Sequence, residues 1–217
     1  MSFADIHTWV FDLDNTLYPA RALYDEIGER MTRYIARATG LDMDSALAFR
    51  ERYFHEYGAT VVGLAKHHGV DASDFLLDVH LADHSVLAPD TELRALIGRL
   101  PGRRIIFTNG GGGHAQRVLE SLNLHGLFEA VFDIEDAELT PKPQRECYER
   151  LMARCGFEPR GALLMEDTLR NLEPAHELGF TTALVGPAHP APRPPYVDHW
   201  APDAKALLRL ALGEETR

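Results

Sequence analysis

Short apolar runs alternate along the chain with polar or glycine-rich turns and with segments whose apolar residues recur at helical spacing. This alternation is typical of βα units, in which helices cover a parallel sheet. Runs of this kind occupy 8–11, 104–108, 130–134, 162–165 and 181–185. The sequence therefore predicts an α/β fold with a Rossmann-like parallel-sheet core.

The segment 18–88 contains no comparable run and predicts an inserted helical domain. Its apolar residues recur at helical spacing at Ile27, Met31, Tyr34, Ile35 and Ala38. A βα connection needs only a few loop residues and one helix, so an insertion of this length directly after the first strand suggests a function, commonly a lid over the site. We therefore predict a core formed by 1–17 and 89–217 and a small α-helical cap formed by 18–88.

Composition narrows the class of protein further. The 217 residues are 45% hydrophobic and 25% charged, which is ordinary for a globular protein and excludes disorder and coiled coil. A formal charge of -11, without a cluster of Lys or Arg, excludes nucleic acid and anionic membranes as expected partners. The chain also shows no signal-peptide pattern and no long apolar window. We expect a cytoplasmic protein, monomer or homodimer, without membrane contact.

The two cysteines support the same compartment. Cys147 and Cys155 are eight residues apart in a predicted helix, which separates them by about 12 Å along the helix axis. This exceeds the Cα separation that a disulfide can span. They are expected to be free thiols in a reducing environment.

Acidic residues follow the first and fourth runs. In an open parallel sheet the reactive groups lie at the carboxyl ends of the strands, and Asp12 and Asp14 end the first run on one side of the backbone. One carboxylate could act as nucleophile or metal ligand and the other as proton donor, although an Asx turn closing the strand is the simpler alternative. Glu166 and Asp167 end the fourth run. Four converging acids would repel one another, which favours a bound divalent cation, Mg²⁺ foremost.

Groups suited to an anion follow the second and third runs. Thr108 and Asn109 precede a glycine run and a predicted helix, whose first N–H groups are unpaired and can bind an anion. Such a glycine run could also be a plain loop. Lys142 lies between two prolines, which suggests a fixed positive charge for an anion.

The motifs, in this order, resemble those of the haloacid dehalogenase superfamily of phosphotransferases, in which four short motifs lie at four strand ends and a cap follows the first. The resemblance implies that Asp12 attacks phosphorus to form an aspartyl-phosphate. It implies that Asp14 protonates the leaving oxygen and then activates water. Thr108 and the Asn109 backbone would bind the phosphoryl group together with Lys142.

The same resemblance implies a metal site. Mg²⁺ would be held by the Asp12 carboxylate, the Asp14 carbonyl and Asp167, with Glu166 beside it directly or through water.

A closer resemblance, to the pyrimidine 5′-nucleotidase branch, runs through most of the chain. It rests on Leu17-Tyr18-Pro19, on 55–60 with Gly63-Leu64, on Val79-His80, on 107–109 followed by 114–119, and on 166–167 with 170–172. The glycine run 110–113 departs from that branch. The resemblance implies a small phosphate ester as substrate, with a nucleoside monophosphate expected.

Other functions remain open at this point. A phosphatase or phosphomutase for another small phosphorylated metabolite would use the same fold, which does not separate them. A 2-haloacid dehalogenase uses a related aspartate without Mg²⁺ but has no need of an acid at Asp14. A non-catalytic binding protein is the alternative from a different class.

Histidines and cap residues give weaker predictions. His80 and His84 lie four residues apart on a predicted helix, a spacing that could bind a transition metal. Without a third nearby ligand they are expected on a solvated surface of the cap. His114 could reach the leaving group or could form only a local hydrogen bond. Tyr24 in the cap and Arg170 beside the fourth motif could contact substrate, or could be packed or solvated side chains.

Overall fold

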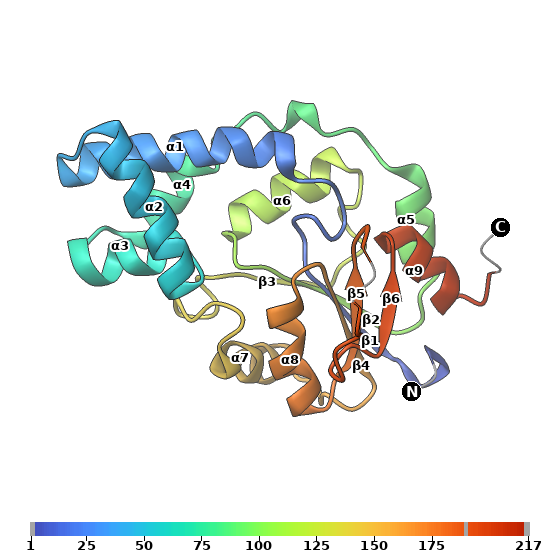
Figure 1. Cartoon of the computed structure of the whole chain (residues 1–217). Helices are drawn as coiled ribbons and strands as arrows, with labels where there is room; N and C mark the ends of the chain where they lie inside the picture. Colours follow the sequence, from blue (N-terminus) through green and yellow to red (C-terminus); the bar gives the residue numbers. More distant parts are fainter. Residues whose placement is uncertain (1–2, 189–190, 215–217) are drawn as a thin grey trace.

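The computed structural model of the protein describes residues 3–188 and 191–214. Within those residues six strands form one parallel sheet, in the order β3-β2-β1-β4-β5-β6 (Figure 1). They are β1 (Thr8–Phe11), β2 (Arg103–Phe107), β3 (Ala130–Phe132), β4 (Ala162–Glu166), β5 (Thr181–Val185) and β6 (His199–Ala201). The predicted α/β fold with a parallel-sheet core is confirmed.

The observed strands follow the predicted runs closely, with one addition. β1 and β5 have the predicted bounds, and the other three predicted strands differ by one or two residues at their ends. β6 was not predicted, because its residues His199, Trp200 and Ala201 do not form an apolar run. It pairs with β5 at the edge of the sheet.

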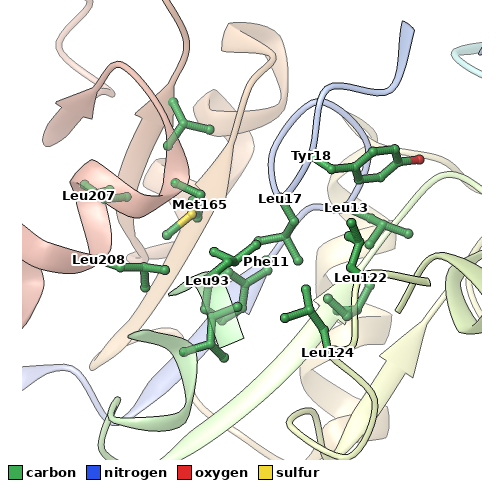
Figure 2. Close-up of a cluster of buried hydrophobic side chains, with 14 of the residues drawn as sticks. Phe11, Leu13, Leu17, Tyr18, Leu93, Leu122, Leu124, Met165, Leu207 and Leu208 are labelled. Carbon is green, nitrogen blue, oxygen red and sulfur yellow. The ribbon is translucent and has the colours of Figure 1, made fainter. Parts of the chain in front are cut away.

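Helices cover both faces of the sheet, because side chains alternate between its faces along each strand. On one face Phe11 and Met165 pack with α5 (Thr91–Gly98), α6 (Gly112–Ser121) and α9 (Ala204–Ala211), and Figure 2 shows their side chains meeting those of Leu93, Leu207 and Leu208. The opposite face carries α7 (Arg145–Cys155) and α8 (Leu169–Leu178). Cys147 and Cys155 lie in α7 as free thiols, as predicted.

Between β1 and α5 the chain forms a layer of helices. These are α1 (Arg21–Thr39), α2 (Met43–Tyr57), α3 (Thr60–His68) and α4 (Ala72–Val79), followed by the short 3₁₀ helix η2 (His84–Val86). Asp42 and Asp71 cap α2 and α4 by accepting backbone N–H bonds. The layer lies beside the sheet (Figure 1) and has its own apolar core, which Ile134 from the loop after β3 joins.

Among the described residues, helices lack the combination of length and apolar character that crossing a membrane requires.

Candidate active site

The predicted site residues meet at the carboxyl edge of the sheet. A cavity of about 450 Å³ lies there, between the sheet and the helical insertion. The core side of the cavity is lined by Asp12, Asp14, Thr108, Asn109, Lys142, Glu166 and Asp167. The residues come from the ends of neighbouring strands, because β1 lies between β2 and β4 in the sheet.

Lys142 occupies the centre of this group. Its Nζ donates to Oδ1 of Asp12 at 2.7 Å, to Oε1 of Glu166 at 2.9 Å and to the carbonyl of Phe107 at 2.9 Å. These acceptors use all three hydrogens of the ammonium group. Burial lowers the pKa of Lys142, but the charges of Asp12 and Glu166 outweigh burial and hold the pKa above its usual value. Lys142 is therefore a fixed positive charge.

The side chain of Asn109 holds the backbone of Lys142. Its Nδ2 donates to the Lys142 carbonyl at 3.0 Å, and its Oδ1 accepts from the Lys142 N–H at 2.8 Å. The sequence predicted only a backbone role for Asn109, because the pairing depends on a contact between distant segments. The Thr108 hydroxyl accepts from the Gly110 N–H at 2.9 Å and is buried beside the cavity.

The carboxylates of Asp12, Glu166 and Asp167 form a cluster. Each offers an oxygen within 4.8 Å of the others. Burial raises the pKa of Asp12 to about 7, with Glu166 adding to the shift and Lys142 opposing it. Burial and the Asp12 charge also raise the pKa of Asp167. The negative charge of the cluster exceeds what Lys142 offsets, so a hard divalent cation with oxygen ligands fits this donor set.

The carboxylates of the cluster differ in the hydrogen bonds that their oxygens accept from the protein. Glu166 accepts from Lys142 and Asn171 through Oε1, and from the Thr168 N–H through Oε2 at 2.6 Å. Asp12 Oδ2 accepts from the Thr16 hydroxyl at 2.7 Å. Both oxygens of Glu166 and both oxygens of Asp12 are thus engaged, since Asp12 Oδ1 accepts from Lys142. Asp167 Oδ1 accepts a longer bond, from the Thr168 hydroxyl at 3.2 Å, which favours Asp167 as a direct ligand of a cation.

Asp14 has a separate environment. Its Oδ1 accepts from the Tyr18 hydroxyl and contacts Nε2 of His114 at 2.9 Å. Burial raises the pKa of Asp14, but the hydrogen bond and charge of His114 and the Tyr18 bond together hold it below its usual value. Two carboxylates two residues apart thus have pKa values displaced in opposite directions. Asp14 favours the ionised form, which can take up a proton, and a cation beside Asp12 would lower the pKa of Asp12 and favour the ionised form that a nucleophile needs.

The prediction that His80 and His84 lie on a solvated surface is wrong. They are only 5% and 8% exposed. Nε2 of His84 lies 3.2 Å from Nδ1 of His114, and the His80 ring stacks on the His114 ring with centroids 4.8 Å apart. The four-residue spacing does not place the two on one helix, because α4 ends at Val79 and η2 begins at His84. The connecting segment brings both rings against α6.

The insertion supplies the opposite wall of the cavity. Its contribution includes Tyr24, Ile27, Met31, Phe54 and His55. Arg170 of the core also lines the cavity, and its guanidinium lies 5.8 Å from the centre of the Phe54 ring. Phe54 was missed by the sequence analysis, since an aromatic residue on an amphipathic helix is usually part of a core.

Comparison with known proteins agrees with this geometry. The family described as haloacid dehalogenase-like hydrolase matches residues 6–179. The chain belongs to this family, which confirms the resemblance at the level of the superfamily.

Individual relatives are more distant. Phosphate metabolism protein 8 of Saccharomyces cerevisiae is 28% identical over 188 residues, which are 78% of this chain and 58% of the yeast protein. The chain thus spans little more than half the length of that relative. A phosphatase of the same superfamily from Thermococcus onnurineus superposes with a TM-score of 0.67 at 16% identity, covering 97% of this chain and 100% of that one. L-2-haloacid dehalogenase from Xanthobacter autotrophicus superposes with a TM-score of 0.61 at 20% identity, with the same coverage. The two solved structures share the fold.

Proposed function

We propose that the protein is a Mg²⁺-dependent phosphate monoester hydrolase that acts through an aspartyl-phosphate on Asp12. The observation that carries this proposal is the pairing of Asp12, bound to the fixed ammonium of Lys142, with Asp14, which lies in the same cavity but has its own hydrogen-bond partners. Family membership supports hydrolysis, and the fixed positive charge of Lys142 beside Asp12 supports an anionic substrate such as a phosphate ester. A second acid beside the nucleophile has no use in dehalogenation.

The donor set fits the metal. Asp12, Asp167 and the Asp14 carbonyl would hold Mg²⁺, with Glu166 acting through its bonds to Lys142 and Asn171. When bound, the ion neutralises phosphate oxygens, which lets a carboxylate approach a dianionic ester.

The chain's own residues then carry out different steps of the reaction. The Thr108 hydroxyl and the Asn109 N–H donate to the phosphoryl group, and Lys142, whose hydrogens are held by its own acceptors, contributes its positive charge to binding that group. A carboxylate oxygen of Asp12 forms a bond to phosphorus as the bond from phosphorus to the leaving oxygen breaks. Asp14 must carry a proton when the substrate is bound; it gives this proton to the leaving oxygen, and later takes a proton from the water that hydrolyses the aspartyl-phosphate.

The insertion 18–88 acts as a cap in this proposal. It closes one side of the cavity and would exclude water during the reaction. Tyr24 and Phe54 offer aromatic surface to a leaving group. Together with the resemblance to the pyrimidine 5′-nucleotidase branch, this favours a nucleoside 5′-monophosphate as the substrate. A cytoplasmic monomer or homodimer is the form expected from the sequence.

The decisive experiment measures phosphate release from UMP, CMP, AMP and GMP, and from phosphoglycolate and a hexose phosphate, with and without Mg²⁺. We expect Mg²⁺-dependent release, with UMP and CMP favoured over AMP and GMP by roughly 10- to 100-fold, because one pocket discriminates size by a few kcal/mol. Equal rates for purines and pyrimidines would exclude selection by base size. A non-nucleotide ester that is hydrolysed much faster would agree with a phosphatase but would refute the assignment as a nucleotidase.

Two further assays separate the alternatives. Conversion of a hexose phosphate into its isomer, without release of inorganic phosphate, would indicate a phosphomutase. Chloride release from 2-chloropropionate without Mg²⁺, and no phosphate release from any ester, would indicate a dehalogenase.

A further inference from the structure

A chain of hydrogen bonds leads from the backbone to Asp14. Nδ1 of His84 lies 2.7 Å from the Ala82 carbonyl, which can only accept, so Nδ1 carries the hydrogen. Burial lowers the pKa of His84, which favours the neutral ring. Its Nε2 is then an acceptor, and the hydrogen bond at 3.2 Å must come from Nδ1 of His114. The direction of the chain thus requires a hydrogen on Nδ1 of His114, which faces His84.

The other nitrogen of His114 holds one oxygen of Asp14. Nε2 of His114 is 2.9 Å from Oδ1, which also accepts from the Tyr18 hydroxyl. Oδ2 of Asp14 has no hydrogen-bond partner in the part of the chain that the structure describes, and the side chain lines the cavity. One oxygen is therefore anchored, and the other is left for the reacting group.

Packing leaves the His114 ring little freedom. The ring is 1% exposed, and the His80 ring lies nearly parallel to it, at an interplanar angle of 23°. Burial lowers the pKa of His80 to about 3, so the imidazole ring that stacks on His114 is uncharged. His80 and His84 flank His114 from the segment that follows α4, and His114 itself lies in α6.

We propose that His84 is a positioning residue, which acts through His114 to hold the Asp14 carboxyl group in the orientation needed for proton transfer to the leaving oxygen. The inference rests on the proposed function, because it assigns Asp14 the role of acid. His84 touches His114 and the Ala82 carbonyl, and no hydrogen bond joins it directly to Asp14 among the described residues. His84 would therefore affect the reaction only indirectly, by orienting the side chains of His114 and Asp14.

The kinetic test compares two substitutions of His84. His84→Leu removes the acceptor for His114, whereas His84→Gln can present a side-chain oxygen in its place. Each variant is assayed with 4-nitrophenyl phosphate, whose leaving group departs without being protonated. Each is also assayed with phenyl phosphate, whose departure depends more strongly on a donated proton. His68→Leu is the matched control, since His68 also bonds a side chain in the insertion, the Tyr53 hydroxyl, but does not line the cavity.

We expect His84→Leu to lower kcat for phenyl phosphate by roughly 10- to 100-fold, because small displacements of a catalytic group cost that much. The loss with 4-nitrophenyl phosphate should be several-fold smaller and KM should change by less than about twofold. His84→Gln and His68→Leu should stay close to the wild type. Equal losses with both esters, or a folded His84→Gln variant as impaired as His84→Leu, would overturn the proposal.

A second measurement does not depend on turnover. The imidazole ¹⁵N–¹H spectrum of the wild-type protein reports which nitrogen of His114 carries a hydrogen toward His84. We expect a hydrogen on Nδ1 in the wild type, and a shifted His114 signal in His84→Leu. An unprotonated Nδ1 in the wild type overturns the hydrogen-bond chain even if a variant fails to fold. Absence of phosphatase activity with the expected spectrum would instead refute the proposed function, and with it the effect of His84 on proton transfer, while the hydrogen-bond chain itself would stand.

Discussion

Nζ of Lys142 lies 2.7 Å from Oδ1 of Asp12, although β2, β3 and most of the helices separate the two residues along the chain. The same ammonium also binds Glu166, so one buried cation orients two acids. Removing one partner of a buried ion pair leaves an uncompensated charge. Substitutions in this group therefore need a check on folding beside the assay of activity.

Asp12→Asn should abolish phosphatase activity and leave the protein folded. An amide of equal size keeps the packing and can still contact Lys142, but it is not a nucleophile toward phosphorus. Steady-state phosphate release measures the loss of activity, and far-ultraviolet circular dichroism shows whether the variant is folded. Retention of more than about a few per cent of the wild-type rate, in a sample checked for deamidation, would place the nucleophile elsewhere.

Asp14→Asn should slow turnover by roughly 10²- to 10⁴-fold, the usual contribution of a general acid or base. The loss should be greatest for esters with poor leaving groups, because these depend most on the donated proton. Comparing 4-nitrophenyl phosphate with an alkyl phosphate measures this difference. A uniform loss across both esters would contradict a leaving-group role for Asp14.

EDTA should remove the activity and Mg²⁺ should restore it, whereas Ca²⁺ should substitute poorly because its larger, looser coordination relaxes the geometry of attack. Asp167→Ala should raise the Mg²⁺ concentration needed for half-maximal activity. The exposed Asp44→Ala in α2 is the control and should leave that concentration unchanged. An unaltered Mg²⁺ requirement in Asp167→Ala would remove Asp167 from the ligands.

Acid should destabilise the protein partly through His80. Burial lowers the folded-state pKa of His80 to about 3, whereas an unfolded histidine titrates near about 6.5. Between these values the unfolded state binds a proton that the folded state does not, so stability falls as the pH falls below about 6.5, by roughly 1.4 kcal/mol per pH unit for one such group.

His80→Phe keeps a stacked ring and removes this proton. Urea unfolding at pH 7 and pH 5 should show a smaller loss of unfolding free energy in the variant, by about 2 kcal/mol. His125→Phe, at an exposed histidine, is the control and should retain the wild-type loss. The same loss in His80→Phe as in the wild type would contradict the assignment of this acid sensitivity to His80.

Much of the site could be predicted because its residues follow apolar runs. Asp12, Asp14, Thr108 and Glu166 stand at or just beyond the ends of β1, β2 and β4, and parallel strands bring such positions to one edge of a sheet. Lys142 was found through its neighbouring prolines. In each case the local sequence carries the signal.

The remaining features depend on contacts between distant segments. The Asn109 side chain was not predicted to hold Lys142, because the loop after β3 brings the two together only in the folded chain. His80 and His84 likewise become buried only against α6. β6 has no apolar run by which it could be recognised, and its place is set by pairing with β5.

The position of β1 in the middle of the sheet also bears on synthesis of the protein. Asp12 leaves the ribosome before its partners Lys142, Glu166 and Asp167, the first of which follows it by 130 residues. A nascent chain that has not yet exposed β4 has no strand on one side of β1 and no acidic cluster. The proposed activity should therefore arise only after β4 has been synthesised, and truncated products ending before β4 should bind no metal at this edge.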